Sequence, residues 1–202
     1  MRGGGARPTI LPEGDCDFTA VTARLRGVTV QVYGGRNGVG SGVVWSSNGL
    51  VVTNAHVAHG RLARVVFPTG HAVEARLVGW DGNADLAALA TDTDGLIAAD
   101  IGDSDALRVG ELVVAVGSPF GLPGAVTAGV IHAVPSRSLG GPRFIEADVR
   151  LAPGNSGGPL ADSRGRVIGI NARIAGGLAL AVPSNVVARF LALVRRGAIA
   201  VP

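Results

Sequence analysis

A glycine-rich segment around a single serine, residues 154–159 (Gly-Asn-Ser-Gly-Gly-Pro), is the most unusual stretch of the sequence. Its glycines would let consecutive backbone N–H groups point into one concavity, where they could stabilise an oxyanion beside the Ser156 hydroxyl. A serine hydroxyl is a poor nucleophile unless a nearby base takes its proton. Taken alone, the segment is equally compatible with a surface turn that contains a serine, so the choice depends on the available bases.

The order of the histidines along the chain restricts the possible catalytic arrangements. All of them precede the serine: His56, His59, His71 and His132. In α/β-hydrolases the histidine follows the serine, so that class is excluded. A subtilisin-like order could formally use Asp15 or Asp17, but it needs a helix-rich α/β chain, which the strand pattern below contradicts. The order that remains is histidine, acid, serine.

His56 is the best placed of the four histidines to act as a base. It follows the apolar run of residues 51–53, so a loop at the end of a strand could present its imidazole to a cleft. A zinc site at His56 and His59 is not supported, because no cysteine pair or HExxH pattern supplies further ligands.

The acid has several candidates, and most aspartates in such places serve turns. They are Asp81, Asp85, Asp92 and Asp94. Asp81 is explained by its turn with Gly82. Asp85 directly precedes an apolar run, residues 86–89, so its carboxylate could accept a hydrogen bond from one imidazole nitrogen while the other nitrogen faces Ser156.

The elements that would position these side chains are predicted to be mostly antiparallel strands. Short β-branched runs alternate with turn signals every 8 to 12 residues or so, as in a sandwich or barrel. The predicted strands form two series of six, joined by a polar linker at residues 91–105: 28–33, 42–45, 50–54, 64–67, 72–80 and 86–90, then 111–117, 125–134, 144–149, 158–161, 167–173 and 178–182. Only the end looks helical, with Ser184 as the predicted N-cap and Gly197 after Arg195 and Arg196.

Composition indicates a folded chain and argues against several classes of function. A chain of 202 residues buries about 70% of its unfolded surface, and 47% of these residues are apolar. The 18 basic residues are all arginines but are scattered, and aromatic residues are only 4%, which argues against a nucleic-acid-binding face. No apolar run approaches the roughly 20 residues that span a bilayer, and residues 1–12 lack the apolar segment of a signal peptide. Cys16 has no partner for an internal disulfide.

Beyond the candidate catalytic residues, a series of short motifs carries a family resemblance. They occur in the family's order between about residues 28 and 185: Gly40-Ser41-Gly42, residues 53–57, Asp85-Leu86-Ala87, residues 102–104 with 107–110, residues 117–122, residues 153–160 and residues 181–185. On these motifs the chain resembles the protease domain of the HtrA/DegP group of trypsin-fold serine proteases. The resemblance implies an all-β fold of two six-stranded antiparallel β-barrels with a short C-terminal helix, and an active site in the cleft between the barrels.

The resemblance also implies roles for individual residues. Ser156 would be the nucleophile, His56 the general base and then acid, and Asp85 the residue that fixes the imidazole tautomer. The N–H groups of Gly154, Asn155 and Ser156 would form the oxyanion hole. No metal or cofactor is implied.

Specificity is also implied by the resemblance. Ile174 and Leu178 would line the first specificity pocket and restrict it to small or medium aliphatic side chains, although ordinary strand packing explains them nearly as well. Arg150 lies where the floor of that pocket is expected, so it would either turn outward to solvent or favour an acidic side chain.

The resemblance also bears on activation. Asn155, which is uncharged, replaces the aspartate that pairs with a freed N-terminal ammonium in digestive relatives, so no activation of that type is expected.

At the level of the whole chain, the expected division is an N-terminal extension (residues 1–23), a first barrel (24–98) and a second barrel with the helix (99–202). We expect no PDZ domain of the kind that the family usually carries. The expected function is a serine endopeptidase of protein quality control that acts on unfolded or exposed protein segments. The alternative is a catalytically silent peptide-binding module.

By resemblance, the chain would be bacterial and extracytoplasmic, in the periplasm or cell envelope. It could form a homo-oligomer such as a trimer.

Overall fold

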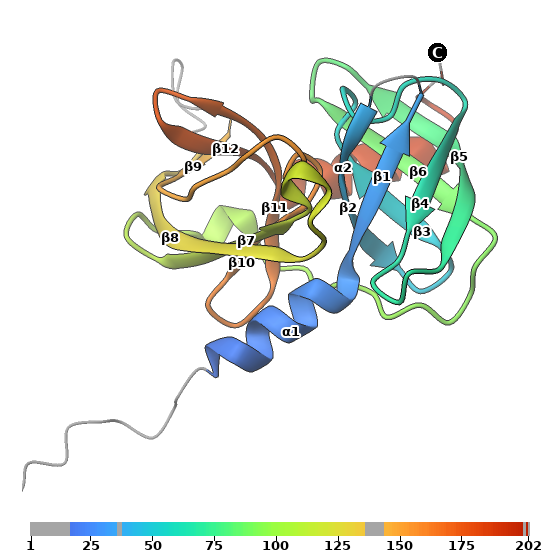
Figure 1. Ribbon diagram of the computed structural model, residues 1–202. Helices are drawn as coiled ribbons and strands as arrows, with labels where there is room; N and C mark the ends of the chain where they lie inside the picture. Colours follow the sequence, from blue (N-terminus) through green and yellow to red (C-terminus); the bar gives the residue numbers. More distant parts are fainter. Residues whose placement is uncertain (1–16, 36–37, 136–143, 200, 202) are drawn as a thin grey trace, which may run out of the picture.

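A computed structural model describes residues 17–35, 38–135, 144–199 and 201 of the chain. Two closed antiparallel β-barrels lie side by side, as the sequence predicted (Figure 1). The first barrel has the strand order β1-β2-β3-β6-β5-β4. Its strands are β1 Thr29–Gly34, β2 Gly38–Ser46, β3 Leu50–Thr53, β4 Leu62–Val66, β5 Ala72–Asp81 and β6 Leu86–Thr91.

The second barrel repeats this architecture with the order β10-β11-β12-β9-β8-β7. Its strands are β7 Leu112–Gly117, β8 Ala125–Ala133, β9 Ile145–Ala147, β10 Pro159–Asp162, β11 Val167–Ala175 and β12 Leu178–Pro183. Two short 3-10 helices accompany it, η1 Ser104–Ala106 and η2 Pro119–Gly121. Each of the twelve predicted strands overlaps one of these strands.

Three apolar clusters hold the barrels in place. One fills the first barrel and includes Val32, Val51 and Leu89. A second fills the other barrel and includes Ile131 and Leu160. The third joins residues of both barrels to the helices, so the two halves share one core; its buried members include Val43, Val52, Leu86, Val114, Val116, Ile170 and Val187. Each fully buried side chain of this size contributes about 1.5 to 3 kcal/mol.

An N-terminal helix, α1 (Phe18–Val28), was not predicted, so the expectation that only the C-terminal end is helical was wrong. The carboxylate of Asp17 caps it by accepting hydrogen bonds from the N–H groups of residues 19 and 20 at 3.0 and 3.1 Å. Its buried residues Val21, Leu25 and Val28 recur at helical spacing, and α1 contacts β7 and β1. Both signals are present in the sequence, but α1 ends at Val28 and β1 begins at Thr29, so no turn marks the boundary between helix and strand.

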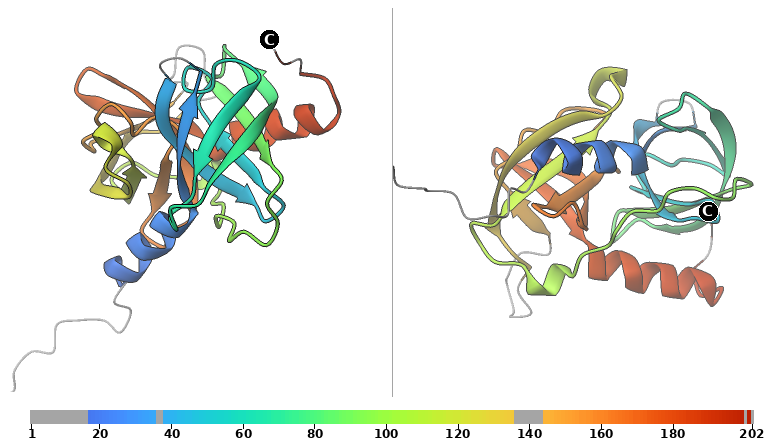
Figure 2. Two further views of the ribbon diagram at one scale, coloured as in Figure 1. Left: turned by 45° about the vertical axis from the view of Figure 1, so that its right-hand side comes forward. Right: turned by 90° about the horizontal axis from the view of Figure 1, so that it is seen from below.

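The C-terminal helix α2 (Ser184–Arg195) follows β12 and crosses back to the first barrel, where it contacts β5 and β6 (Figure 2). The prediction of Ser184 as its N-cap was wrong. Pro183 occupies that position, and the Ser184 hydroxyl donates instead to the carbonyl oxygen of Gly102 at 2.7 Å. The predicted end is confirmed, since Gly197 follows the helix with φ +67°.

The start of α2 is also tied to the linker between the barrels. The side-chain amide of Asn185 donates to the Asp103 carboxylate at 2.7 Å, and the backbone N–H of Asn185 donates to Ser104 Oγ at 3.1 Å. The hydrogen bond from Asn185, together with one from the Asp105 N–H, lowers the pKa of Asp103. Neither helix in the described part of the chain is long and apolar enough to cross a membrane.

Candidate active site

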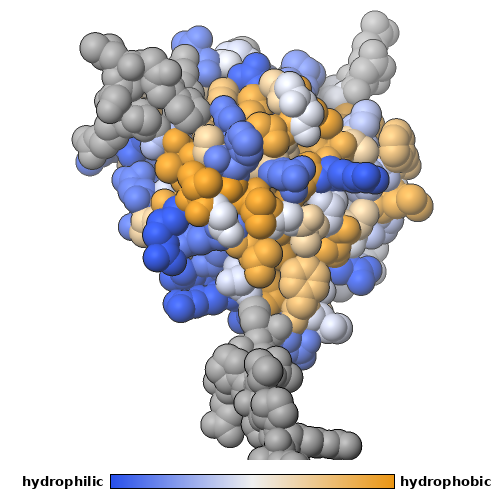
Figure 3. Space-filling view, turned by 90° about the vertical axis from the view of Figure 1, so that its left-hand side faces the viewer, coloured by the Kyte–Doolittle hydropathy of each residue, from blue (hydrophilic) through white to orange (hydrophobic). Residues whose placement is uncertain are grey.

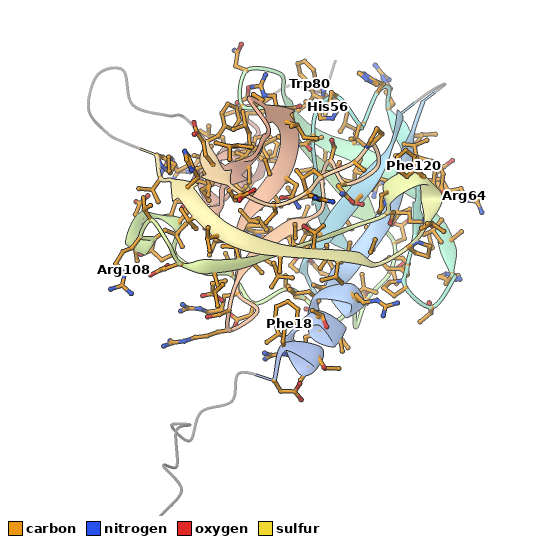
Figure 4. All side chains as sticks on the ribbon, turned by 60° about the vertical axis from the view of Figure 1, so that its left-hand side comes forward. Phe18, His56, Arg64, Trp80, Arg108 and Phe120 are labelled. Atoms are coloured by element: carbon orange, nitrogen blue, oxygen red, sulfur yellow. The ribbon has the colours of Figure 1, made fainter. Side chains whose placement is uncertain are left out.

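His56 is presented by a turn at the end of β3. The N–H groups of Val57 and Ala58 both donate to the carbonyl oxygen of Asn54, at 3.1 and 3.2 Å, and so fold the chain directly after the strand. The indole Nε1 of Trp80 donates to the Ala55 carbonyl at 3.3 Å, and Figure 4 shows Trp80 close to His56. Hydrogen bonds therefore fix the turn that carries the imidazole, and 47% of the His56 side chain is exposed.

Asp85 is held against His56 from the turn before β6. Its carboxylate lies 2.9 and 3.0 Å from His56 Nδ1 and also accepts the backbone N–H of His56 at 3.1 Å. In the neutral imidazole, this contact places the proton on Nδ1 and leaves Nε2 as the acceptor. Asn54 fixes the segment further, because its side-chain amide donates to the Asp85 carbonyl at 2.9 Å.

The backbone of Asp85 is strained, with φ at +55°. Aspartate tolerates this left-handed region better than most residues, and such strain is concentrated at functional sites. The rival candidate Asp81 is used elsewhere, since its carboxylate accepts the N–H groups of Asn83 and Ala84 at 2.9 and 3.0 Å. The structure therefore brings Asp85, and not Asp81, to the histidine.

Ser156 lies in the loop before β10 and faces the same cleft as His56. This hollow of about 290 Å³ is lined by one residue of the first barrel and seven of the second: His56, Leu151, Ala152, Pro153, Ser156, Ala172, Arg173 and Ile174. The Ser156 hydroxyl donates to the carbonyl oxygen of Ala172 on β11 at 3.0 Å. Within the described residues, no hydrogen bond joins Ser156 to His56, so sequence reasoning placed both at the cleft but did not foresee the direction of the hydroxyl.

The loop around Ser156 depends on glycine at position 154. Gly154 has φ +105°, and a Cβ there would lie 2.3 Å from the carbonyl oxygen of Ser118. The Asn155 N–H donates to the Ala152 carbonyl at 3.0 Å, so it is already engaged. Of the three predicted oxyanion donors, the N–H groups of Gly154 and Ser156 therefore remain available, and no acceptor for them occurs among the described residues.

Asn155 itself is buried, with 4% of its surface exposed, and it packs against Gly117. Its Oδ1 has no hydrogen-bond partner in the described part of the chain. The position before the serine is thus filled by a neutral side chain inside the protein.

Ser41 of β2 positions the serine loop, a role that sequence reasoning missed. Its N–H donates to the Ser156 carbonyl at 2.7 Å, and its hydroxyl donates to the Gly154 carbonyl at 2.8 Å. The same hydroxyl accepts the Ser118 N–H at 2.9 Å. The Gly-Ser-Gly motif at residues 40–42 was noted only as part of the resemblance. The structure shows that its serine holds the loop that carries Ser156.

Of the two predicted specificity residues, only Ile174 lines the cleft. Ile174 lines the cleft and is 52% exposed, whereas Leu178 is half-buried opposite Ala175 in the β11–β12 hairpin and is not among the lining residues. Leu151 forms part of the wall and was not predicted; its place five residues before the serine was the available signal. Arg150 is exposed and does not line the cleft.

Among the described residues, no group of three or more histidine, cysteine, aspartate or glutamate side chains could hold a metal ion.

Comparisons with known proteins place this fold and site in a family. The family model described as "Trypsin-like peptidase domain" matches residues 40–170. The chain therefore belongs to the family of trypsin-like peptidase domains.

Within that family, similar proteins confirm the resemblance to the HtrA/DegP group. The chain is 45% identical over 163 residues to a protein of Halomonas elongata named "Probable periplasmic serine endoprotease DegP-like", covering 75% of this chain and 34% of that protein. It is 41% identical over 161 residues to the mitochondrial serine protease HTRA2 of Bos taurus, covering 75% of this chain and 35% of the relative. The chain thus spans about a third of the length of these relatives.

A solved structure agrees with the sequence matches. The structure described as "HtrA-type protease AlgW with tripeptide" superimposes with a TM-score of 0.82 at 33% identity, covering 90% of this chain and 64% of the other.

Proposed function

We propose that this chain is a serine endopeptidase that hydrolyses peptide bonds in unfolded or exposed protein segments. One observation carries the proposal: His56 and Ser156 face one cleft between two barrels, and the Asp85 carboxylate is hydrogen-bonded to Nδ1 of the imidazole, which leaves Nε2 for the reaction. The relatives are named as serine proteases, which supports the assignment of a serine endopeptidase.

The chemistry is acyl transfer in two halves. His56 Nε2 takes the proton from the Ser156 hydroxyl as Oγ attacks the peptide carbonyl, and then donates it to the leaving amine. This releases the first product and leaves an ester on Ser156. Water then attacks the ester with the same histidine acting as base. Asp85 keeps the proton on Nδ1 and stabilises the imidazolium as it forms.

The developing oxyanion is stabilised by backbone donors. The N–H groups of Gly154 and Ser156 belong to a loop that Ser41 and Ser118 fix through hydrogen bonds. Donors fixed in advance in this way need no reorganisation during the reaction.

Substrate binding would also redirect the nucleophile. A peptide that adds as a strand beside β11 donates an N–H to the Ala172 carbonyl, which in the free chain accepts the Ser156 hydroxyl. Competition for that oxygen would favour a hydroxyl that turns toward His56.

The first specificity pocket is proposed to accept small or medium aliphatic side chains. Ile174 and Leu151 line the cleft, and Leu178 supports the β11–β12 hairpin from which Ile174 projects. Apolar walls favour aliphatic groups, because burial of apolar area drives their binding.

The proposed cellular placement rests on the names of the relatives. Several of these are named periplasmic endoproteases, and we place this chain outside the cytoplasm on that basis.

Figure 3 shows apolar residues gathered on the side of the molecule that the second barrel occupies. Exposed apolar side chains of that barrel, among them Leu112, Phe120, Leu122, Val126 and Val130, support self-association into a homo-oligomer such as a trimer.

The test of the proposed function uses one protein substrate in two states. We expect the chain to cleave a reduced, unfolded polypeptide and to leave the disulfide-bonded native form of it intact. Mass spectrometry of the fragments should show cleavage mainly after valine, alanine or isoleucine. Binding of the unfolded polypeptide without any fragments would instead identify a silent peptide-binding module, and cleavage mainly after glutamate or aspartate would contradict the aliphatic pocket.

A further inference from the structure

One edge of β11 is open beside the nucleophile. Between β10 and β11 the ladder ends at Ile170, and the next residue, Asn171, bonds to the backbone of Gly157 and Gly158. Beyond Asn171, β11 is paired only with β12 within the described residues. A bulge at this point turns the Ala172 carbonyl toward the open edge, where it meets Ser156.

The register of a peptide on this edge follows from strand geometry. Backbone groups alternate along a strand, so Ala172 and Ile174 direct theirs to the open edge, while Arg173 directs its backbone to Leu180 of β12. The peptide residue that bonds to Ala172 lies beside Ser156, and its carbonyl is the one attacked. An antiparallel peptide then places its next residue toward the N-terminus opposite Arg173. Side chains directly opposite in such a pair share one face, about 5 Å apart at Cβ.

Arg173 is an exposed cation with a fixed position. It lines the cleft together with His56, and its guanidinium carbon lies 4.7 Å from the centre of the Phe144 ring. Stacking on an aromatic face orients the guanidinium without neutralising its charge.

The charge of Arg173 is also unpaired. Among the described residues it forms no ion pair with a carboxylate. In the sheet register, the nearest acidic residue on this face is Glu146. It lies on β9, on the opposite side of β12 from Arg173, and is paired with Leu180. For Arg150 the sequence left two alternatives, a side chain turned to solvent or one that favours an acidic group in the first pocket, and the structure has it exposed and outside the cleft.

We propose that Arg173 makes this site select peptides with aspartate or glutamate immediately N-terminal to the residue whose carbonyl is attacked. This selection rests on the endopeptidase function proposed above and adds to it a second, charged position beside the aliphatic one. An exposed ion pair of this kind should favour the acidic peptide by about 2-fold to 5-fold at low salt. The preference should decline as salt screens the pair.

The experiment compares two peptides that differ only by glutamate or glutamine at this position. Binding is measured by fluorescence anisotropy on chains that carry Ser156→Ala, so the result does not depend on catalysis, and kcat/KM is measured with the natural serine. We expect the glutamate peptide to be favoured in both. Arg173→Met, which keeps the length of the side chain, should remove the preference. Arg173→Glu should reverse it, and Arg173→Lys should restore it in part.

Arg150→Met is the matched control, because it removes the same charge from the same barrel outside the cleft, and the preference should persist in it. Equal binding of the two peptides to the natural cleft, or a preference that survives Arg173→Met or disappears in Arg150→Met, would overturn the proposal. A binding preference without cleavage of either peptide would support the role of Arg173 and would count against the endopeptidase function alone.

Discussion

Replacement of Ser156 by alanine is expected to lower kcat by on the order of 10⁶ while leaving the fold intact. The loss is this large because the attacking oxygen disappears and the base has nothing to activate. Structurally the hydroxyl contributes one partly buried hydrogen bond, to Ala172 at 3.0 Å. Its loss costs about 0.5 to 1.5 kcal/mol, so the melting temperature should change little.

Steady-state hydrolysis of a peptide with valine before the cleaved bond gives the measurement, with circular dichroism to verify the fold. Ser47→Ala is the matched control, since Ser47 is an exposed serine in the turn between β2 and β3 and does not line the cleft. It should retain full activity. A loss of less than about 100-fold in Ser156→Ala would show that another group carries the nucleophilic step.

Replacement of Asp85 by asparagine is expected to lower kcat by about 10⁴. Asparagine tolerates the φ of +55° at this position as well as aspartate does, so the backbone should keep its conformation. The amide can donate to His56 Nδ1, however, which would place the imidazole proton on Nε2, where the base must accept. The variant also removes the negative charge that stabilises the imidazolium.

The comparison with Asp81→Asn separates the two aspartates. The side-chain oxygen of asparagine can still accept the two backbone N–H groups that Asp81 now accepts, so this variant should stay within a few-fold of the natural chain. If Asp81→Asn instead shows the larger loss in kcat, the role given to Asp85 is wrong.

The strands were predictable because their signals are local. Alternating β-branched runs and turns such as Asp81-Gly82 predict the two series of six strands, and the family resemblance implies that they form barrels. The order of His56, Asp85 and Ser156 along the chain excludes other hydrolase classes. Helix α1 was missed although Asp17 and the spacing of Val21 and Leu25 signal it, because much of its stability comes from packing these residues against strands of both barrels, which the local sequence does not display.

Details of the site were less predictable, since they depend on segments far apart in the chain. The Ser156 hydroxyl points to Ala172, sixteen residues later, and the serine loop depends on Ser41, more than a hundred residues earlier. Arg173 lines the cleft beside a bulge in β11, and its guanidinium stacks on Phe144, which directly precedes β9. Spacing in the sequence alone predicts none of these contacts.

Covalent labelling with a fluorophosphonate probe, followed by peptide mapping, tests the central claim most directly. The claim is that His56 and Asp85 of the first barrel make the Ser156 hydroxyl of the second barrel nucleophilic. It predicts a single adduct on Ser156 in the natural chain and none in Ser156→Ala. Labelling that persists in Ser156→Ala, or a natural chain that stays unlabelled, would contradict it.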